Sequence, residues 1–568
     1  MTAEPVFSPL ESKQSRRLIW LGWGLICIHG LLVAYLATRY TPTQDEVAHL
    51  PAGLANWKLG RTDVYCVNPP LVRSVAVFPL LFVEHQEDWT PLSQPMVRPE
   101  WALGTIYVKA NGRTSWWHMT LARWACLPFT LLGAILCWKW GTVLWGNVPG
   151  LLTLSLWCFS PNILGYAALI TPDVPSISVF LLSTWVFRQW LMQPDLMNAG
   201  KAGAALGLTL LVKSQWLILI PIWLLWGAFS CWQFGQLRKG LGELLFLNLV
   251  AWNVLCLGFG LRGIGQPLGE LGYYSRAMSG ETRWQHNASP GELRWKFLQH
   301  VPSPVPPDFI RGIDLQAVDF EHGRPCYLLG SWTERGRLPF YFIGLLVKTP
   351  LALTAMLLLS ATLWIGMLRK RMWASASTRS DFLLLVVPST LVFGIATWQT
   401  GLHVYVRYVF VLLPVFYLAV GSAWVLCSSA WIRYLLLLLV GLFAIESLSA
   451  YPQSLSFFNV AAGGPRGGIQ FLNDANVDWG QDLRLVDEWI RLHPAAKPVH
   501  LNWPGFYNAK DVGLPAGFPK SRSPRPGWYI FSRHTLQQQD DGYAEFRVLK
   551  PVAGLGATHV VYHIPEAL

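Results

Sequence analysis

The chain has 568 residues, of which 52% are hydrophobic and 13% are charged, and its formal net charge is +12. Soluble domains carry about 25% charged residues, so this composition indicates a protein whose solvent is lipid. It excludes an intrinsically disordered chain and a secreted disulfide scaffold. An excess of Lys and Arg marks the cytoplasmic loops of membrane proteins, and we therefore do not interpret it as nucleic-acid binding.

The first membrane span is predicted over residues 18–37, an apolar run of about 20 residues that is long enough to cross a bilayer. The basic stretch Lys13–Arg17 precedes it and no small-residue cleavage site follows, so we expect an uncleaved helix with a cytoplasmic N-terminus. The polar segment 39–119 then lies on the outer side. Its short apolar stretches, 47–59 and 71–83, are predicted to be helices lying in the membrane interface.

The number of spans depends on residues 202–232, which as one helix would be roughly 46 Å long, too long for one untilted span. If two short spans instead meet at Lys213, the cluster Arg369–Arg371 and the other basic clusters all lie in the cytoplasm. We therefore predict about 11 spans, with a second outer segment at 262–338. The other apolar runs are 120–138, 149–166, 174–191, 241–261, 339–367, 382–398, 405–427 and 431–449.

The predicted fold is an all-α polytopic membrane protein with a small soluble domain. Residues 1–450 form the transmembrane domain, with its two outer segments. Residues 451–568 have the composition of a soluble α/β domain. An odd number of spans places this domain on the side opposite the N-terminus, which is the outer side; we refer to this counting of spans as parity. The expected location is a multi-pass cell membrane, with the site and the C-terminal domain facing away from the cytoplasm.

Two acidic side chains follow the first span at the predicted membrane edge. Asp45 and Glu46 are adjacent, and His49 lies four residues after Asp45, on the same face of the following helix. Plain helix capping is the alternative interpretation. Asp173 stands in an outer turn, Thr171–Pro175, which parity brings to the same surface. Ionisable groups at membrane depth are functional by default, so we predict that these acids form a site.

A second group of side chains near the outer rim of the membrane is basic. It consists of Lys213, Lys348, His403 and Arg407. Snorkelling to the headgroups is the alternative for a cation near the rim. Several cations converging there would suit a phosphate, which Arg binds through two N–H groups. Arg407 is the first candidate and Lys348 the next. The stretch from Asn68 to Arg73, which contains Pro-Pro, is either a structural corner or a contact to the site.

The late segment 459–483 has the acidic spacing Asp474, Asn476, Asp478 and Asp482. Its glycine stands one place late for an EF-hand, so we reject that calcium loop and predict no metal ligands. No Cys or His spacing suits zinc. Walker A, GxSxG and HExxH sequences are also absent, which excludes the machinery of an ATP-driven pump and of a membrane metalloprotease.

These motifs in this order resemble glycosyltransferase family 39-like proteins of the GT-C superfamily, which use polyprenyl-phosphate sugars. The resemblance is carried by the acidic pair after the first span, by NPPL with its Arg, by Pro-Asp-Val-Pro, by Lys-Thr-Pro in the eighth span and by the late GGP and DxNxDWGQDL sequences. Relatives include protein O-mannosyltransferases and the aminoarabinose transferase of lipid A. The resemblance covers nearly the whole chain and depends on order and topology rather than on any single motif.

The resemblance implies an inverting sugar transfer on the outer face of the membrane, from a lipid-phosphate donor to a hydroxyl acceptor. It implies that Asp45 is the base, with Glu46 beside it and Asp173 as the second acid. It also implies that Arg407 and Lys348 hold the lipid phosphate. Beside them we predict Lys213 and His403 as further phosphate ligands. We predict contacts to the acceptor or the loops from His49, Asn68 and Arg73. No cofactor is required, although a divalent cation is compatible with it.

Two other classes remain open. A secondary transporter also places charges near broken helices, but it would not explain two large outer segments and an outer domain. A non-catalytic assembly or receptor protein is the third interpretation. Cys66 and Cys326 are the two cysteines assigned to the outer segments, where a disulfide between them would join the segments. Two unrelated thiols are the favoured alternative.

Overall fold

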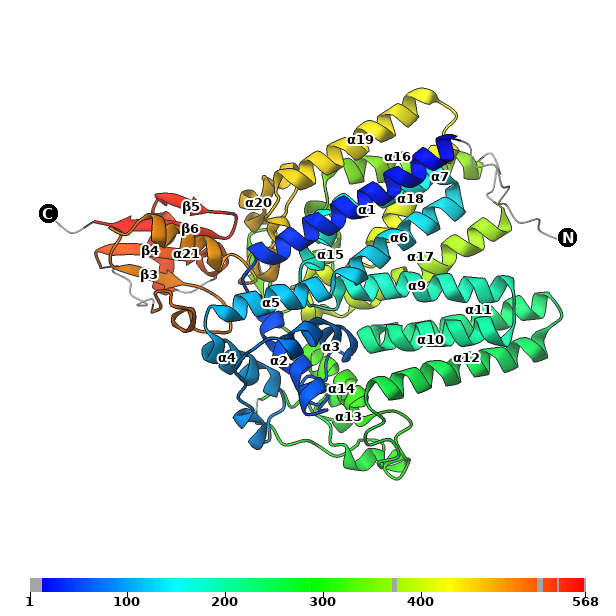
Figure 1. Ribbon diagram of the computed structural model, residues 1–568, viewed down its shortest axis with the longest axis horizontal. Coiled ribbons are helices and arrows are strands. Elements are labelled where there is room, and N and C mark those ends of the chain that lie inside the picture. The colour runs from blue at the N-terminus through cyan, green and yellow to red at the C-terminus, as the bar shows by residue number, and fades with distance from the viewer. Residues whose placement is uncertain (1–12, 286, 370–374, 518–524, 539–540, 566–568) are drawn as a thin grey trace.

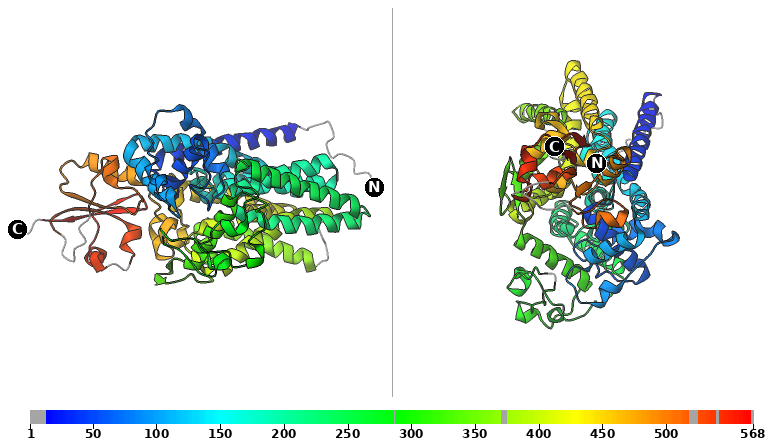
Figure 2. Two further views of the ribbon diagram at one scale, coloured as in Figure 1. Left: turned by 90° about the horizontal axis from the view of Figure 1, so that it is seen from below. Right: turned by 90° about the vertical axis from the view of Figure 1, so that its left-hand side faces the viewer.

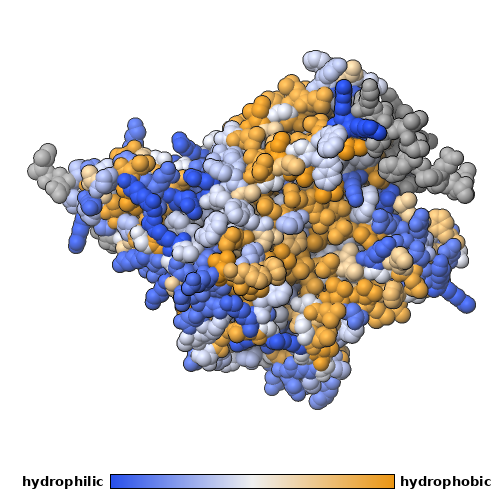
Figure 3. Space-filling model, in the orientation of Figure 1, coloured by the Kyte–Doolittle hydropathy of each residue, from blue (hydrophilic) through white to orange (hydrophobic). Residues whose placement is uncertain are grey.

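The computed structural model describes residues 13–285, 287–369, 375–517, 525–538 and 541–565. Most of this chain is helical, as predicted, and its long helices lie side by side (Figure 1). The start of helix α1 and the C-terminal sheet lie at opposite ends of the molecule (Figures 1 and 2). The surface over the helices is largely hydrophobic, whereas the C-terminal region is largely hydrophilic (Figure 3).

Among the described residues, six helical segments are long and apolar enough to cross a membrane, and up to eight if each of two bent pairs is one span. The chain is therefore a polytopic membrane protein, and the 11 spans stay a prediction. Only 22% of the α1 window and 17% of the α19 window are buried, so these helices face outward. The six segments are α1 (Lys13–Arg39), α5 (Thr114–Ala125) with α6 (Leu127–Trp145), α11 (Leu219–Gln233) with the preceding 3-10 turn, α12 (Leu237–Gly258), α17 (Ala376–Trp398) and α19 (Ala430–Ser449).

Two predicted spans are bent rather than straight. The run 149–166 divides into α7 (Asn147–Phe159) and α8 (Pro161–Ala167), at 55° to each other. The run 339–367 divides into α15 (Phe340–Lys348) and α16 (Leu351–Arg369), at 111°. A proline stands at each break, where it removes a backbone donor and disfavours helix in the residue before it. The second bend leaves Lys348 at a helix end inside the protein.

The predicted break at Lys213 is confirmed. Helix α10 (Leu196–Val212) ends just before it, and the 3-10 turn Ser214–Ile218 leads into α11. The Lys213 Nζ lies 3.2 Å from Oδ1 of Asp173, the first residue of α9 (Asp173–Met192). The break therefore lies at the same end of the helices as the Pro-Asp-Val-Pro turn. In the basic cluster used for the topology, Lys370 and Arg371 lie outside the described residues.

The segment after α1 folds into short helices, as predicted, and their position in the membrane interface stays a prediction. Helices α2 (Gln44–Lys58) and α3 (Leu71–Val77) cover the two predicted stretches, and α4 (Pro99–Asn111) follows. The second polar segment contains α13 (Arg276–Ser279), α14 (Pro307–His322) and an antiparallel hairpin of β1 (Cys326–Leu328) and β2 (Ser331–Thr333). Cys66 and Cys326 are both buried and both free, so no disulfide joins these segments.

The C-terminal part contains a four-stranded sheet in the order β3-β4-β6-β5. Strands β3 and β4 are parallel, while β6 is antiparallel to β4 and β5. The division of the chain near residue 450 stays a prediction. The elements are α18 (Leu412–Leu426) before α19, and then α20 (Gly464–Gly467), α21 (Leu483–Leu492), β3 (Val499–Asn502), β4 (Gly527–Ser532), α22 (Arg533–Leu536), α23 (Ala544–Val548), β5 (Ala553–Leu555) and β6 (His559–Ile564).

Candidate active site

Arg407 brings two of the predicted acidic residues, Asp45 and Asp173, into one cluster. Its Nη2 donates a hydrogen bond to Oδ2 of Asp45 at 2.8 Å, and its Nη1 lies 3.7 Å from Oδ2 of Asp173. The Arg407 side chain is 4% exposed, whereas Asp45 is 24% exposed. Residues that are far apart in the sequence therefore share one charge cluster, as parity required.

The backbone places Arg407 before a helix and not within one. The predicted span 405–427 becomes helical only at Leu412, and Arg407 lies in the 3-10 turn Val406–Val409. Three aromatic rings enclose its guanidinium, whose carbon lies 4.0 Å from the ring centre of Trp479 and 4.7 Å from that of Tyr405. Tyr408 is the third, at 5.7 Å. Such faces attract a cation and leave its N–H edge directed at acceptors.

A cavity of about 70 Å³ opens beside this cluster. Lys213 reaches it from the α10 break and lies 5.2 Å from the ring centre of Tyr408. The walls carry four cationic and three acidic side chains, and Glu100 behind the wall pairs with Arg98, so the charges of the cavity nearly balance. The lining residues are Asp45, Tyr65, Val67, Asn68, Arg98, Trp101, Pro172, Asp173, Lys213, Gln316, Asp319, Arg324, Leu402, Tyr405, Arg407 and Tyr408.

The two polar segments supply wall residues that the sequence analysis did not select. Arg98 pairs with Asp319 of α14, with 3.3 Å between Nη1 and Oδ1. Arg324 donates from Nη1 to the Tyr405 hydroxyl at 2.6 Å. Arg98, Asp319 and Arg324 lie in segments that carry no local sequence motif. The one signal that they could belong to the site was the predicted position of these segments on the outer side. The tyrosines beside Arg407 did carry a signal, because they flank it in the sequence.

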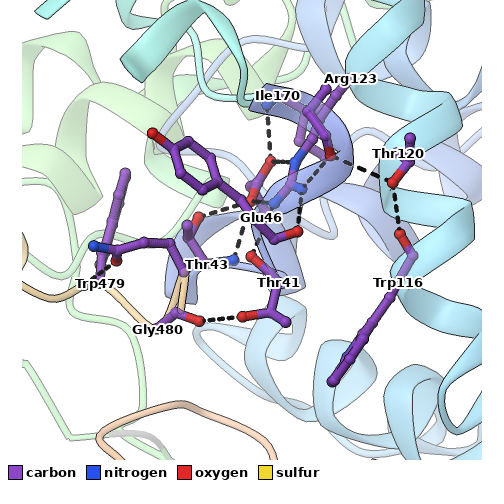
Figure 4. A network of polar contacts seen from close by, with 12 residues as sticks. Thr41, Thr43, Glu46, Trp116, Thr120, Arg123, Ile170, Trp479 and Gly480 are labelled. Atoms are coloured by element: carbon purple, nitrogen blue, oxygen red, sulfur yellow. Dashed lines mark hydrogen bonds and ion pairs between the residues drawn. The ribbon is translucent and has the colours of Figure 1, made fainter. Parts of the chain in front are cut away.

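Glu46 does not line the cavity and instead lies in a buried network of polar contacts (Figure 4). Its Oε2 accepts from Nη2 of Arg123 at 2.6 Å and from the Thr43 backbone N–H at 3.0 Å. Its Oε1 accepts from Nε of Arg123 at 2.8 Å and from the Ile170 N–H at 3.1 Å. Both charged side chains are fully buried. The helix-capping alternative therefore describes Glu46, while Asp45 on the next position faces the cavity.

Arg123 connects the end of α1 to the start of α2. Its Nη1 donates to the carbonyls of Ala37 and Tyr40, at 3.0 and 2.7 Å, and its Nη2 also donates to the Thr41 carbonyl at 3.0 Å. Together with Glu46 these contacts use all the donor directions of a guanidinium. The pair thus fixes the turn that carries Asp45.

Two predicted phosphate ligands are engaged elsewhere. The Lys348 Nζ is buried and donates to the carbonyls of Leu455 and Asn476, each at 2.8 Å. The His403 ring contacts the carbonyls of Arg337 and Ala396, at 2.9 and 3.1 Å. Neither side chain lines the cavity. The His403 contact to Ala396 follows from the end of α17, because a helix end leaves carbonyls that need donors, whereas the Lys348 partners lie in the segment after α19.

Of the three residues predicted to contact the acceptor or the loops, one lines the cavity and two lie behind its wall. Asn68 lines the cavity and donates from Nδ2 to the Tyr65 hydroxyl at 3.0 Å. Arg73 is buried behind it and donates to the Asn68 carbonyl and, at 3.4 Å, to that of Thr62. The His49 ring is buried 4.7 Å from the Tyr65 ring. Arg73 and His49 therefore support the Tyr65–Asn68 wall from behind.

The late DWGQD sequence holds the turn after α1. The Thr41 N–H donates to the Gln481 carbonyl at 2.8 Å, and the Thr41 hydroxyl donates to the Gly480 carbonyl at 2.7 Å. Gly480 has a φ of 91°, which side chains rarely adopt. Since Trp479 packs on Arg407, this segment positions both members of the Arg407–Asp45 pair. Among the described residues, no group of three or more His, Cys, Asp or Glu side chains is placed to hold a metal ion.

Asp482 ends this segment and is buried against the sheet. Its Oδ2 accepts from the Thr558 hydroxyl at 2.9 Å. Burial, followed by the charge of Asp478, raises the pKa of Asp482 to about 7. An unfolded Asp titrates near pH 3.9. Between these values the unfolded chain loses a proton that the folded chain keeps, so this group lowers stability as the pH rises from about 4 to about 7.

We expect Asp482→Asn to remove this pH-dependent loss, because the amide oxygen still accepts from Thr558 and carries no charge. The melting temperature of the variant minus that of the wild type should increase from pH 5 to pH 7 and then stay constant. Asp511→Asn, at a partly exposed carboxylate, is the control. A difference that does not change with pH would exclude Asp482 as the group responsible.

The chain was also compared with known proteins. No family model matches it, and no curated protein matches it. It is similar to the solved structure of ArnT from Cupriavidus metallidurans bound to undecaprenyl phosphate, with 14% identity and a TM-score of 0.46, over 97% of this chain and 98% of that one. For the apo state of the same protein, the identity is 13% and the TM-score 0.43, over 96% and 98%. The function of this chain is therefore inferred from its own side chains.

Proposed function

We propose that the chain is an integral membrane glycosyltransferase. It moves a sugar from a polyprenyl-phosphate donor to a hydroxyl group of a protein, lipid or glycan, on the outer face of the membrane. The N-terminus is cytoplasmic and the C-terminal sheet lies on the same side as the site.

One observation carries this proposal: Arg407 stands between two carboxylates with donor capacity to spare. Its Nε and Nη1 are buried and make no hydrogen bond to any described residue. A guanidinium with unused N–H groups at the end of a helix bundle is suited to a phosphate, whose charged oxygens accept strong hydrogen bonds.

In the proposed reaction the carboxylate of the cluster acts on the acceptor, and its cations act on the donor phosphate. The Asp45 carboxylate accepts the proton of the acceptor hydroxyl as its oxygen bonds to the anomeric carbon. The bond between that carbon and the phosphate oxygen breaks, and the electron pair leaves with the polyprenyl phosphate. Arg407 and Lys213 stabilise the charge that develops on this phosphate. Attack opposite the leaving group inverts the anomeric centre.

We infer that the donor phosphate exchanges with a carboxylate of the Arg407 cluster, because the Nη2 of Arg407 is already bonded to Asp45. When Arg407 turns to the phosphate, Asp45 is released toward the acceptor, while Asp173 keeps Lys213 in place. We propose that Glu46, Lys348 and His403 act by holding the walls, since their polar atoms are already bonded.

Comparison of membranes from cells with and without the protein tests this function. Mass spectrometry of their glycans, glycolipids and glycoproteins should reveal a species that lacks one sugar when the protein is absent. The purified protein should then transfer that sugar from its polyprenyl-phosphate carrier. A secondary transporter would instead change the distribution of a solute and leave every glycan unchanged.

Arg407→Gln should weaken binding of undecaprenyl phosphate about 10- to 100-fold, because hydrogen bonds to charged groups contribute about 1.5–3 kcal/mol. Binding is measured by titration of the purified protein. Arg188→Gln is the matched control, since it breaks the pair with Asp381, whose side chains are each 12% exposed and line no part of the cavity. Equal losses in both variants would count against a phosphate site at Arg407.

A further inference from the structure

A second cavity, larger than the first, lies where α1, α5 and α21 meet. Its volume is about 710 Å³, and it shares no lining residue with the Arg407 cavity. Arg39 comes from the end of α1 and Arg113 from the turn before α5, while Arg484 and Arg491 come from α21. We refer to it as the four-arginine groove. The proposed transfer reaction makes no use of it.

The groove is lined by four arginines and by two acidic side chains, Asp487 and Glu488, so its charges are not balanced within the protein. Asp487 pairs with Arg113 at 2.6 Å and with Arg491 at 2.7 Å. This leaves Arg39 and Arg484 without an ion-pair partner among the described residues. The Arg484 Nε is buried and makes no hydrogen bond there. An unpaired, partly buried guanidinium is costly unless an anion completes it.

The two unpaired side chains also act on one another. Burial, and after it the charge of Arg39, lowers the pKa of Arg484. Two cations that repel each other across a groove are relieved when one anion bridges them. The Trp116 ring lies 5.2 Å from the Arg484 guanidinium carbon and fixes its direction. The geometry therefore defines an anion site and not merely a basic surface.

The groove also lies at the boundary of the membrane. Arg39 is the last residue of the candidate span Arg16–Arg39, and Trp116 and Trp117 stand at the start of the candidate span Thr114–Trp145. Trp117 is 49% exposed. Tryptophan side chains gather at the level of the lipid headgroups, where the anions closest to a protein are lipid phosphates.

We propose that the four-arginine groove binds the anionic phosphate of a membrane lipid, with Arg39 and Arg484 as its two ligands. The lipid chains lie along α1 and α5, and the phosphate connects these spans to α21. Since α21 follows directly from the segment that packs on Arg407, the bound lipid stabilises the docking of the C-terminal sheet. This site and the proposed transferase site stand on separate residues.

The full-length protein tests this proposal in nanodiscs of phosphatidylglycerol and of phosphatidylcholine. Native mass spectrometry should show retained phosphatidylglycerol, and the melting temperature should be higher in the anionic lipid. Each basic side chain near an anionic surface contributes a factor of about 5 in binding, so Arg39→Gln with Arg484→Gln should weaken lipid retention roughly 25-fold. The double Arg→Lys variant, which keeps both charges, should retain the lipid.

A control cation and a free anion distinguish a lipid site in the groove from a general effect of positive charge. Lys296→Gln removes an exposed cation paired with Glu292, far from these helices in sequence, and should change neither readout. The two single Arg→Gln variants should each lose lipid about fivefold and cover the case in which the double variant does not fold. Equal lipid retention in wild type and the double variant would overturn the proposal. The proposal would also be overturned if inorganic phosphate alone raised the melting temperature as much as phosphatidylglycerol does, because the groove would then bind a free anion.

Discussion

Asp45→Asn should reduce sugar transfer by a factor of about 10²–10⁴, the range expected when a general base is lost. The amide keeps the shape of the side chain, and its oxygen can still accept from Arg407, so the pair at 2.8 Å loses its charge but not its geometry. Undecaprenyl phosphate should therefore still bind. A neutral amide accepts no proton from a hydroxyl, and the transfer step fails while donor binding survives.

Turnover is measured as the amount of sugar transferred by purified protein, alongside donor binding and melting temperature. Asp63→Asn is the matched control, because Asp63 lies in the same segment, pairs with Arg61 and does not line the cavity. The two results together distinguish a base from a structural acid. Wild-type turnover in Asp45→Asn would falsify the assignment, as would a loss of the same size in Asp63→Asn.

Much of the fold could be predicted from the sequence because membrane spans depend on local apolar length. The break at Lys213 followed from a run too long for one span, and the short helices after α1 followed from runs too short for any. The bends at Ser160 and Thr349 were not predicted, although a proline follows each. Within an apolar run a proline is compatible with either a kink or a straight helix, and packing decides between them.

The site was predicted to the extent that its residues carry charge in apolar surroundings. Asp45, Asp173, Lys213 and Arg407 line one cavity, and each lies near the end of a helix or at a break between helices. The sequence could not distinguish Asp45 from Glu46, because adjacent helical residues point 100° apart and only tertiary contacts decide which one faces the cavity. Arg98 and Arg324 were missed because a cation in a long polar segment carries no local signal of burial.

The largest effect on stability is expected at Arg123, which pairs with Glu46 and not with Asp45. Arg123→Met leaves the Glu46 carboxylate buried and without its cation, and breaking a buried ion pair on one side costs about 3–5 kcal/mol. It also releases the carbonyls at the end of α1, at Ala37, Tyr40 and Thr41, so the turn before Asp45 loses its anchor. We expect a large fall in melting temperature in detergent, with transfer lost as a consequence.

The charge and the anchor can be separated by a second substitution. Glu46→Gln added to Arg123→Met removes the unpaired charge, and its single amide oxygen can still accept from one of the two backbone N–H groups, that of Thr43 or that of Ile170. The double variant should therefore be more stable than Arg123→Met alone, even though it carries one change more. Arg61→Met, at an ion pair whose side chains are 37% and 32% exposed, should cost no more than about 1 kcal/mol.

If Glu46→Gln instead lowers the stability of Arg123→Met further, the fall comes from the lost carbonyl contacts and not from the unpaired carboxylate. Partial recovery of melting temperature without recovery of transfer would show that the α1 carbonyl contacts, and not the charge, hold Asp45 at the cavity.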